Sequence, residues 1–244
     1  MKNKILTAFV FGILLITSSS YAQVTKKVLE LPEFRSIYVN SNYTVYLKQT
    51  NKQEVSVEAL TDIYTLSDIK VENGILMINI DRKPENPNKS IWSKIDDIKL
   101  NPTMKLYVSM KNINDLMVNG NGKIISENSI AANNLNLSLN GGGFMEIDLK
   151  GETVKVEVNG TGTLVLKGYA TTLDASLGGS GNLQAYDCPL ETAKVKVSGS
   201  GNCEVNATNS IEAFVFGSGW VKHKGNTKNT VKKVYGSGSV DRAY

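Results

Sequence analysis

A Gly-x-Gly motif that recurs seven times in the second half of the sequence restricts what this chain can fold into. The second glycine of each motif stands at Gly122, Gly143, Gly162, Gly181, Gly201, Gly219 and Gly238, with spacings of 21, 19, 19, 20, 18 and 19 residues. A nearly constant period of this length is typical of a repeat architecture in which each unit stacks on its neighbours. The repeats therefore predict one elongated domain rather than two ordinary ones.

Apolar residues recur at fixed positions around the glycines. Four residues before the second glycine the chain has Val118, Leu139, Val158, Leu177, Val197, Val215 and Val234, and two residues after it Ile124, Met145, Leu164, Leu183, Cys203, Val221 and Val240. Side chains alternate across a strand, so these positions and the glycines are expected to share one inward face. The predicted fold is all-β, a single-stranded parallel β-helix (a β-solenoid) with coils of about 19 residues that rise about 4.8 Å each.

The first half of the chain also alternates apolar and polar residues in short runs, which indicates strands. Aligning residues 37–42 on residues 175–180 places Val45 in the apolar column that follows the glycines, so a degenerate copy of the repeat is predicted here. We therefore expect irregular N-terminal coils over residues 23–112 and regular coils over residues 113–244.

Residues 82–97 interrupt the strand pattern with Pro84, Pro87 and several Asn and Lys residues around one large apolar side chain, Trp92. Such a composition predicts a loop that leaves the solenoid. Loops on rigid scaffolds often carry function, which makes Trp92 a candidate binding residue. The alternative is that Trp92 only anchors the loop to the body.

The first 22 residues have the features of a secretory signal peptide: a short basic start, an apolar run over residues 5–16 and the small-residue site Ser20-Tyr21-Ala22. Cleavage there would leave a mature chain that begins at Gln23, with no integral membrane segment expected after it. We expect an exported protein, located in the periplasm, on the outer surface or outside the cell.

The charge balance of the mature chain argues against one class of partner. Removing residues 1–22 takes two of the 27 basic residues and none of the 23 acidic ones, which leaves a net charge of +2. Nucleic acid as a partner would call for a basic stripe, so no nucleic acid is expected.

The residues that commonly carry catalysis do not form a recognisable set. Cys203 stands in an apolar column and is expected to be a buried free thiol, although a disulfide with Cys188 is the alternative. The only histidine, His223, stands in an inward column, which favours a packing residue over a general base. No neighbouring coils place two carboxylates at one position, as a glycosidase would need. The sequence therefore predicts no enzyme, no catalytic residue, no metal site and no cofactor.

The outward columns suggest where binding would occur. Stacked Asn, Ser and Thr residues are expected to bond from coil to coil, and a ladder of Glu204, Lys222 and Asp241 to contribute little. Near the C-terminal end these columns become aromatic, at Phe214, Phe216, Trp220 and Tyr235. The first two and Tyr235 are expected on one face, with Trp220 beyond a bend. They predict contact with a second subunit or with a cell-surface glycan or protein, unless residues 241–244 or a neighbouring segment cover them as a cap.

Three stretches carry a resemblance to a known family: Glu33-Phe34-Arg35-Ser36-Ile37-Tyr38-Val39, Val45-Tyr46-Leu47-Lys48-Gln49 and Asn73-Gly74-Ile75-Leu76, followed by the Gly-Ser-Gly motifs. Together they resemble the auto-transporter adhesin "head GIN" domain common in exported proteins of Bacteroidetes. The resemblance implies a right-handed single-stranded β-helix at the cell envelope or surface, and the family has no catalytic residues to transfer.

These observations favour a non-enzymatic, exported adhesin or cell-envelope interaction module. One alternative is a polysaccharide-binding or polysaccharide-active protein on a pectate-lyase-like scaffold, an analogy of fold alone. Another is a structural periplasmic rod that assembles through its ends.

Overall fold

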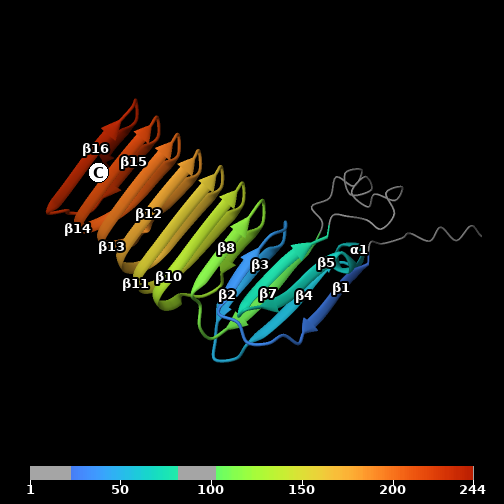
Figure 1. The fold of residues 1–244 in the computed structure, drawn as a ribbon. Coiled ribbons are helices and arrows are strands. Elements are labelled where there is room, and N and C mark those ends of the chain that lie inside the picture. Colours follow the sequence, from blue (N-terminus) through green and yellow to red (C-terminus); the bar gives the residue numbers. More distant parts are fainter. Residues whose placement is uncertain (1–22, 82–102, 244) are drawn as a thin grey trace, which may run out of the picture.

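A computed structural model describes residues 23–81 and 103–243 of the chain (Figure 1). The expected signal peptide, the predicted loop at residues 82–97 with Trp92, and Tyr244 lie outside the described residues. The N-terminal part contains β1 (Val24–Leu29), β2 (Ser36–Val39), β3 (Thr44–Gln49), β4 (Glu54–Leu60), α1 (Thr61–Thr65), β5 (Ser67–Glu72), β6 (Ile75–Ile80) and β7 (Met104–Met110). The C-terminal part contains β8 (Asp115–Asn119), β9 (Lys123–Ser126), β10 (Ile130–Gly141), β11 (Phe144–Gly160), β12 (Thr163–Gly179), β13 (Asn182–Gly199), β14 (Asn202–Gly217), β15 (Trp220–Lys224), β16 (Asn229–Tyr235) and β17 (Ser239–Arg242).

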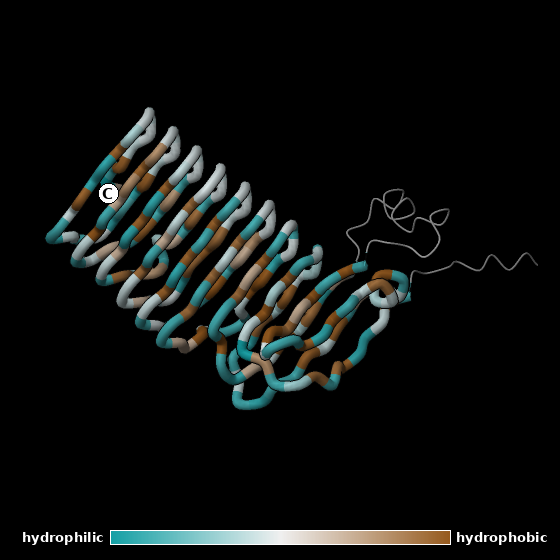
Figure 2. Tube along the Cα trace, viewed as in Figure 1, coloured by the Kyte–Doolittle hydropathy of each residue, from teal (hydrophilic) through white to brown (hydrophobic). Residues whose placement is uncertain are grey.

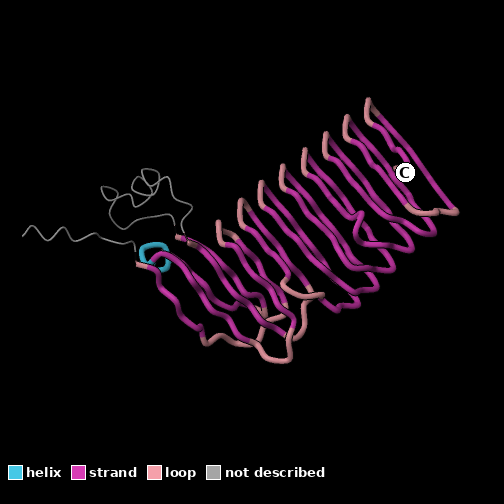
Figure 3. The backbone as a smooth tube through the Cα atoms, turned by 180° about the vertical axis from the view of Figure 1, so that it is seen from behind, coloured by secondary structure: helices cyan, strands magenta, loops and turns pink. Residues whose placement is uncertain are grey.

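Flattened coils stack side by side to form the long body of the molecule (Figures 1 and 3). Each long strand follows both broad faces of its coil and pairs in parallel with the next, as β11 does with β12 from Phe144–Thr163 to Gly160–Gly179. The predicted all-β class is confirmed, as a β-solenoid of about seven turns spaced about 19 residues apart.

Two sheets enclose the core, and we name them by their position relative to the Gly-x-Gly turns. The pre-turn sheet contains β2, β6, β8, β16 and the C-terminal halves of β10 to β14. The post-turn sheet contains β3, β7, β9, β15, β17 and the N-terminal halves of β11 to β14. Each Gly-x-Gly turn joins one sheet to the other.

Glycine is required at these turns because successive turns lie directly on one another. Gly141 has φ +115°, and a Cβ there would lie 2.8 Å from the carbonyl oxygen of Gly120 one coil below. A Cβ on Gly143 would lie 2.6 Å from the oxygen of Gly122 and 2.7 Å from Val118 Cγ1. The first glycine therefore serves the bend, and the second allows the chain to close on a narrow interior.

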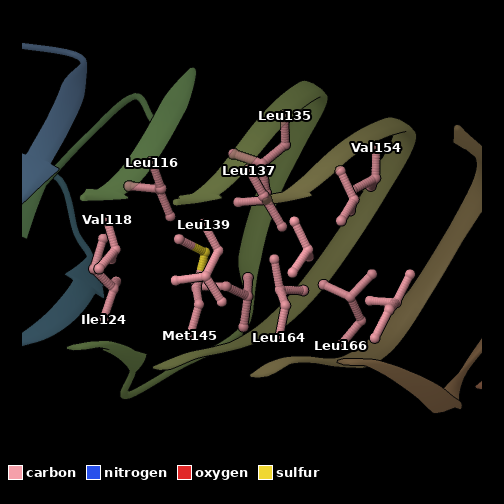
Figure 4. Close-up of a cluster of buried hydrophobic side chains, with 14 of the residues drawn as sticks. Leu116, Val118, Ile124, Leu135, Leu137, Leu139, Met145, Val154, Leu164 and Leu166 are labelled. Carbon is pink, nitrogen blue, oxygen red and sulfur yellow. The ribbon is translucent and has the colours of Figure 1, made fainter. Parts of the chain in front are cut away.

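Aliphatic side chains from both sheets fill the interior. In Figure 4, Leu137 and Leu139 of the pre-turn sheet point toward Met145 and Leu164 of the post-turn sheet, and all four are buried. Brown and teal segments alternate along the strands in Figure 2, as the inward and outward positions require. Burying one such side chain contributes about 1.5–3 kcal/mol, so the repeated columns stabilise the solenoid layer by layer.

The degenerate repeat predicted in the first half is a true coil. Ile37 pairs with Leu116 and Val45 with Ile124, which is the register given by the sequence alignment. Strands β6 and β7 then add one more parallel layer on β2 and β3.

The N-terminal end departs from the parallel pattern expected of irregular coils. Strand β4 is antiparallel to β7 and β1, and β5 is antiparallel to β6 across the turn at Asn73-Gly74. The short turn between β5 and β6 forces these two strands to run in opposite directions. Strand β4 follows β3 after residues 50–53 and runs back against β7, which is itself parallel to β3. Among the described residues, helix is confined to the five residues of α1.

Candidate functional site

The four aromatic residues identified in the sequence lie at the C-terminal end of the solenoid. Phe214 and Phe216 are on β14 and Tyr235 is on β16, where Phe216 pairs with Tyr235 across the pre-turn sheet. Trp220 begins β15 in the post-turn sheet. The predicted arrangement is confirmed, with three of the aromatic residues on one outer face and Trp220 beyond the turn.

Strand pairing places two of these rings in direct contact. The centroids of Phe216 and Tyr235 are 5.1 Å apart and their planes differ by 8°. Their residues remain 41% and 58% exposed, whereas Phe214 is half-buried. The stacked pair therefore presents aromatic surface to solvent rather than to the core.

Lysine side chains accompany the rings on both outer faces. Lys196 Nζ lies 5.5 Å from the Phe216 centroid and Lys233 Nζ lies 5.9 Å from that of Phe214. On the other sheet, Lys222 Nζ lies 4.7 Å from the Trp220 centroid and Lys224 Nζ 5.1 Å from that of Tyr186. Each exposed contact of this kind contributes about 0.5–1 kcal/mol. We call the rings and their lysines the C-terminal aromatic surface, which comprises Tyr186, Lys196, Phe214, Phe216, Trp220, Lys222, Lys224, Lys233 and Tyr235.

Column analysis of the sequence missed two features of this surface. The lysines flanking Phe214 stand in its own outward column, and that signal is readable from the period alone. Tyr186 stands five residues after Gly181 and Lys224 five residues after Gly219, so the period also carried the signal for this pair.

The C-terminal residues do not cap the aromatic rings. Residues 239–242 form β17, which pairs with β15 in the post-turn sheet, so the capping alternative is wrong for residues 241–243. Among the described strands, β16 pairs only with β14 and β17 only with β15. The end of the solenoid is consequently an open sheet edge, with Val234 of the inward column 40% exposed.

Two long basic side chains cross this open end. Lys232, on the inward side of β16, donates a hydrogen bond from Nζ to the carbonyl oxygen of Val240, 3.1 Å away in the opposite sheet. Arg242 donates to the carbonyl oxygen of Gly225 and to Asn226 Oδ1. The core is therefore closed at this end by charged side chains rather than by a further layer of backbone.

His223 lies beneath these charges as a buried packing residue, as predicted. It is 2% exposed, and neither ring nitrogen has a hydrogen-bond partner among the described residues. Burial lowers the pKa of His223 below 6.5, and the positive charges of Lys232 and Arg242 lower it further. The imidazole is therefore neutral at pH 7.

We expect His223 to make the fold less stable in mild acid. Because its pKa is lower in the folded chain, the unfolded chain binds the proton first as the pH falls below about 6.5. The free energy of unfolding then decreases by at most about 1.4 kcal/mol per pH unit until the pKa of the folded state is reached. Urea denaturation of the wild type and His223→Val between pH 7.5 and 5 measures this. Carboxylates contribute equally to both proteins, so identical slopes would contradict the prediction.

Both cysteines are free and buried, so the disulfide alternative is wrong. Burial raises the pKa of Cys188 to about 11, and it also raises the pKa of the Cys203 thiol. Both groups are therefore protonated at neutral pH, which is unfavourable for a nucleophile or a metal ligand. The predicted role of Cys203 as a small apolar residue of the core is confirmed.

The outward asparagines satisfy one another, as the sequence predicts. The side-chain amide of each donates to the next along a single ladder: Asn159 to Asn140, Asn140 to Asn119, Asn119 to Asn40 and Asn40 to Asn79, at 2.7–3.2 Å. Glu204, Lys222 and Asp241 are in register on successive strands, and Lys222 lies over Trp220. The asparagine ladder thus stabilises the stack, and its amide groups are used by one another rather than offered to a ligand.

A concave surface lies in the described part of the chain between β2, β8 and the start of β10, away from the C-terminal aromatic surface. It is an open groove of about 750 Å³ lined by Arg35, Asn112, Ile113, Asn114, Asp115, Ala131, Ala132, Asn133, Asn134, Asn136 and Lys150. Asp115 is already bound, since Ser36 donates to one carboxylate oxygen and Asn136 to the other. The remaining amides offer hydrogen bonds to a polar ligand, but the lining contains no aromatic ring.

Within residues 23–81 and 103–243, no group of three or more His, Cys, Asp and Glu side chains is arranged to hold a metal ion. No helix in the same part of the chain is both long and apolar enough to span a membrane. Fold and site together define an all-β solenoid that presents a rigid, exposed surface of aromatic and basic residues.

The chain belongs to the family described as "Putative auto-transporter adhesin, head GIN domain", whose model matches residues 33–227. No curated protein matches the sequence.

Crystal structures from two Bacteroidetes genera have a similar fold. A putative adhesin from Bacteroides fragilis is 22% identical with a TM-score of 0.78, covering 91% of this chain and 98% of its own. A putative adhesin from Parabacteroides distasonis is 20% identical with a TM-score of 0.71, with coverages of 91% and 98%. A putative lipid binding protein from the same species is 23% identical with a TM-score of 0.71, with coverages of 91% and 97%.

Proposed function

We propose that this protein is a non-enzymatic, exported adhesion module of the cell envelope that binds its partner through the C-terminal aromatic surface. The observation that carries the proposal is the stacked pair Phe216 and Tyr235, which is exposed at an open end of a rigid scaffold. Family membership and the adhesins among the structural neighbours support a binding role.

The physical properties of the surface suit binding. Aromatic side chains supply a large contact area for little lost conformational entropy, and they dominate many interfaces. The rings project from a sheet whose strands β13, β14 and β16 are paired in that order. Because these strands are already fixed, the rings need little reorganisation before contact. Trp220 and, outside the described residues, Trp92 are proposed as further contact residues.

Binding of the purified exported chain to bacterial cells and to arrays of glycans and envelope proteins tests the proposal. The double variant Phe216→Ala/Tyr235→Ala is expected to lose at least about tenfold in affinity, equivalent to about 1.4 kcal/mol. Trp220→Ala and Trp92→Ala test the remaining residues separately.

Tyr169→Ala is the matched control, because Tyr169 is 54% exposed on β12 and lies outside the C-terminal aromatic surface. It is expected to change affinity less than twofold. If Phe216→Ala and Trp220→Ala leave both binding and oligomeric state unchanged, the surface has no role in adhesion. A particle mass in light scattering that rises with concentration would instead favour rods assembled through their ends.

A further inference from the structure

We infer that the partner of the C-terminal aromatic surface is an acidic polysaccharide, an inference that rests on the proposed function and names its ligand class. The first observation is a charge asymmetry along the solenoid. Residues 214–244 contain six basic residues and one acidic residue, a net charge of +5, whereas residues 23–213 contain 19 basic and 22 acidic residues, a net charge of −3. The aromatic end of the molecule is therefore the end that attracts anions.

The second observation is the alternation of rings and ammonium groups on the pre-turn sheet. Lys196, Phe214 and Lys233 are in register on three successive strands, and Ser198, Phe216 and Tyr235 form the next row. Neighbouring strands are about 4.8 Å apart, so each ring has a lysine within one or two strand spacings. A sugar ring can stack its apolar C–H face on an aromatic side chain while its carboxylate or sulfate pairs with a lysine.

The post-turn sheet repeats this pairing of ring and ammonium group with Trp220 beside Lys222 and Tyr186 beside Lys224. The two faces lie on opposite sides of the flattened coil. A long flexible polymer can reach both faces by passing around the open end, which a flat partner surface cannot do.

The open edge argues against a lipid bilayer as the partner. Strands β16 and β17 each have one edge without a neighbour among the described strands, so backbone N–H and C=O groups point outward there. Insertion of these groups into hydrocarbon would leave them without hydrogen bonds, at a high free-energy cost. The hydroxyl and carboxylate groups of a polysaccharide can instead bond to them.

The charges on β16 argue against a second copy of the chain. Lys232 projects to the inward side of this edge strand and Lys233 to the outward side. Pairing two β16 edges would bring these like charges together, and lysines on an edge strand are a common protection against such pairing.

A binding assay with the purified exported chain and immobilised acidic polymers tests the inference. The polymers are polygalacturonate, alginate and chondroitin sulfate, and fully methyl-esterified polygalacturonate is the matched neutral control. At least one acidic polymer is expected to bind ten times or more tightly than the ester, and more weakly as salt rises from 50 to 200 mM. Lys196→Gln/Lys233→Gln is expected to lose at least tenfold. Phe216→Ser/Tyr235→Ser is expected to lose at least fivefold at unchanged charge.

Lys48→Gln/Lys123→Gln is the control for net charge, since both lysines are exposed on the N-terminal half of the solenoid. An equal loss in this control would mean non-specific attraction and overturn the inference. So would failure of all three acidic polymers, or tighter binding to vesicles of phosphatidylglycerol. If Phe216→Ala/Tyr235→Ala still abolishes adhesion to cells in that case, the proposed function stands and only the ligand class falls.

Discussion

Alanine in place of Gly143 is expected to lower the free energy of unfolding by about 3 kcal/mol, at the upper end of what an overpacked core position costs. The added Cβ would lie 2.6 Å from the carbonyl oxygen of Gly122, which belongs to the backbone of the coil below. It would also lie 2.7 Å from Val118 Cγ1 in the core. The carbonyl oxygen cannot withdraw without separating two paired strands, and the branched Val118 side chain is fully buried with little room to turn aside. Urea denaturation followed by circular dichroism measures the loss.

Gly142 provides a control one residue away. A Cβ there would approach Asn121 Oδ1 at 2.9 Å and Thr161 Oγ1 at 3.5 Å, which are the ends of side chains that can turn aside. Other coils carry serine at this outward position, as Ser180 and Ser200 do. Gly142→Ser is therefore expected to change stability by less than about 0.5 kcal/mol. Equal losses in the two variants would mean that glycine serves chain flexibility rather than the close stacking of turns.

The same close stacking explains why so much of the solenoid was predictable from the sequence. A coil that repeats within a few residues places each position directly over its counterpart, so Cys203 and Leu183 occupy equivalent sites and are both buried. The period also located Phe216 and Tyr235 on one face, since residues one coil apart become neighbours. Local repetition here determines long-range contact, which is rare in proteins without repeats.

The remaining features depend on contacts that the period does not encode. The antiparallel pairing of β5 with β6 follows from the turn at Asn73-Gly74, whereas β4 pairs with β1 and β7, which are distant from it in sequence. Strands β1, β4 and β5 share no column with the repeats. The bulge between Ala185 and Pro189 interrupts the register of β13 against β14 within one coil. Columns also carry no information on where the stack ends, and at that end Val234 was expected to be buried and is 40% exposed.

Position along the stack should therefore decide what a core substitution costs. Leu139→Ala is expected to lower the free energy of unfolding by about 3 kcal/mol, because Leu139 is fully buried between two complete coils. Val234→Ala, in the same inward column, is expected to cost less than about 1 kcal/mol, because solvent already reaches this side chain and no coil lies beyond it. Urea denaturation of both variants measures the difference. Similar losses would mean that β16 is covered in solution, by another copy of the chain or by residues outside those described, and the open end would then not be free to bind a partner.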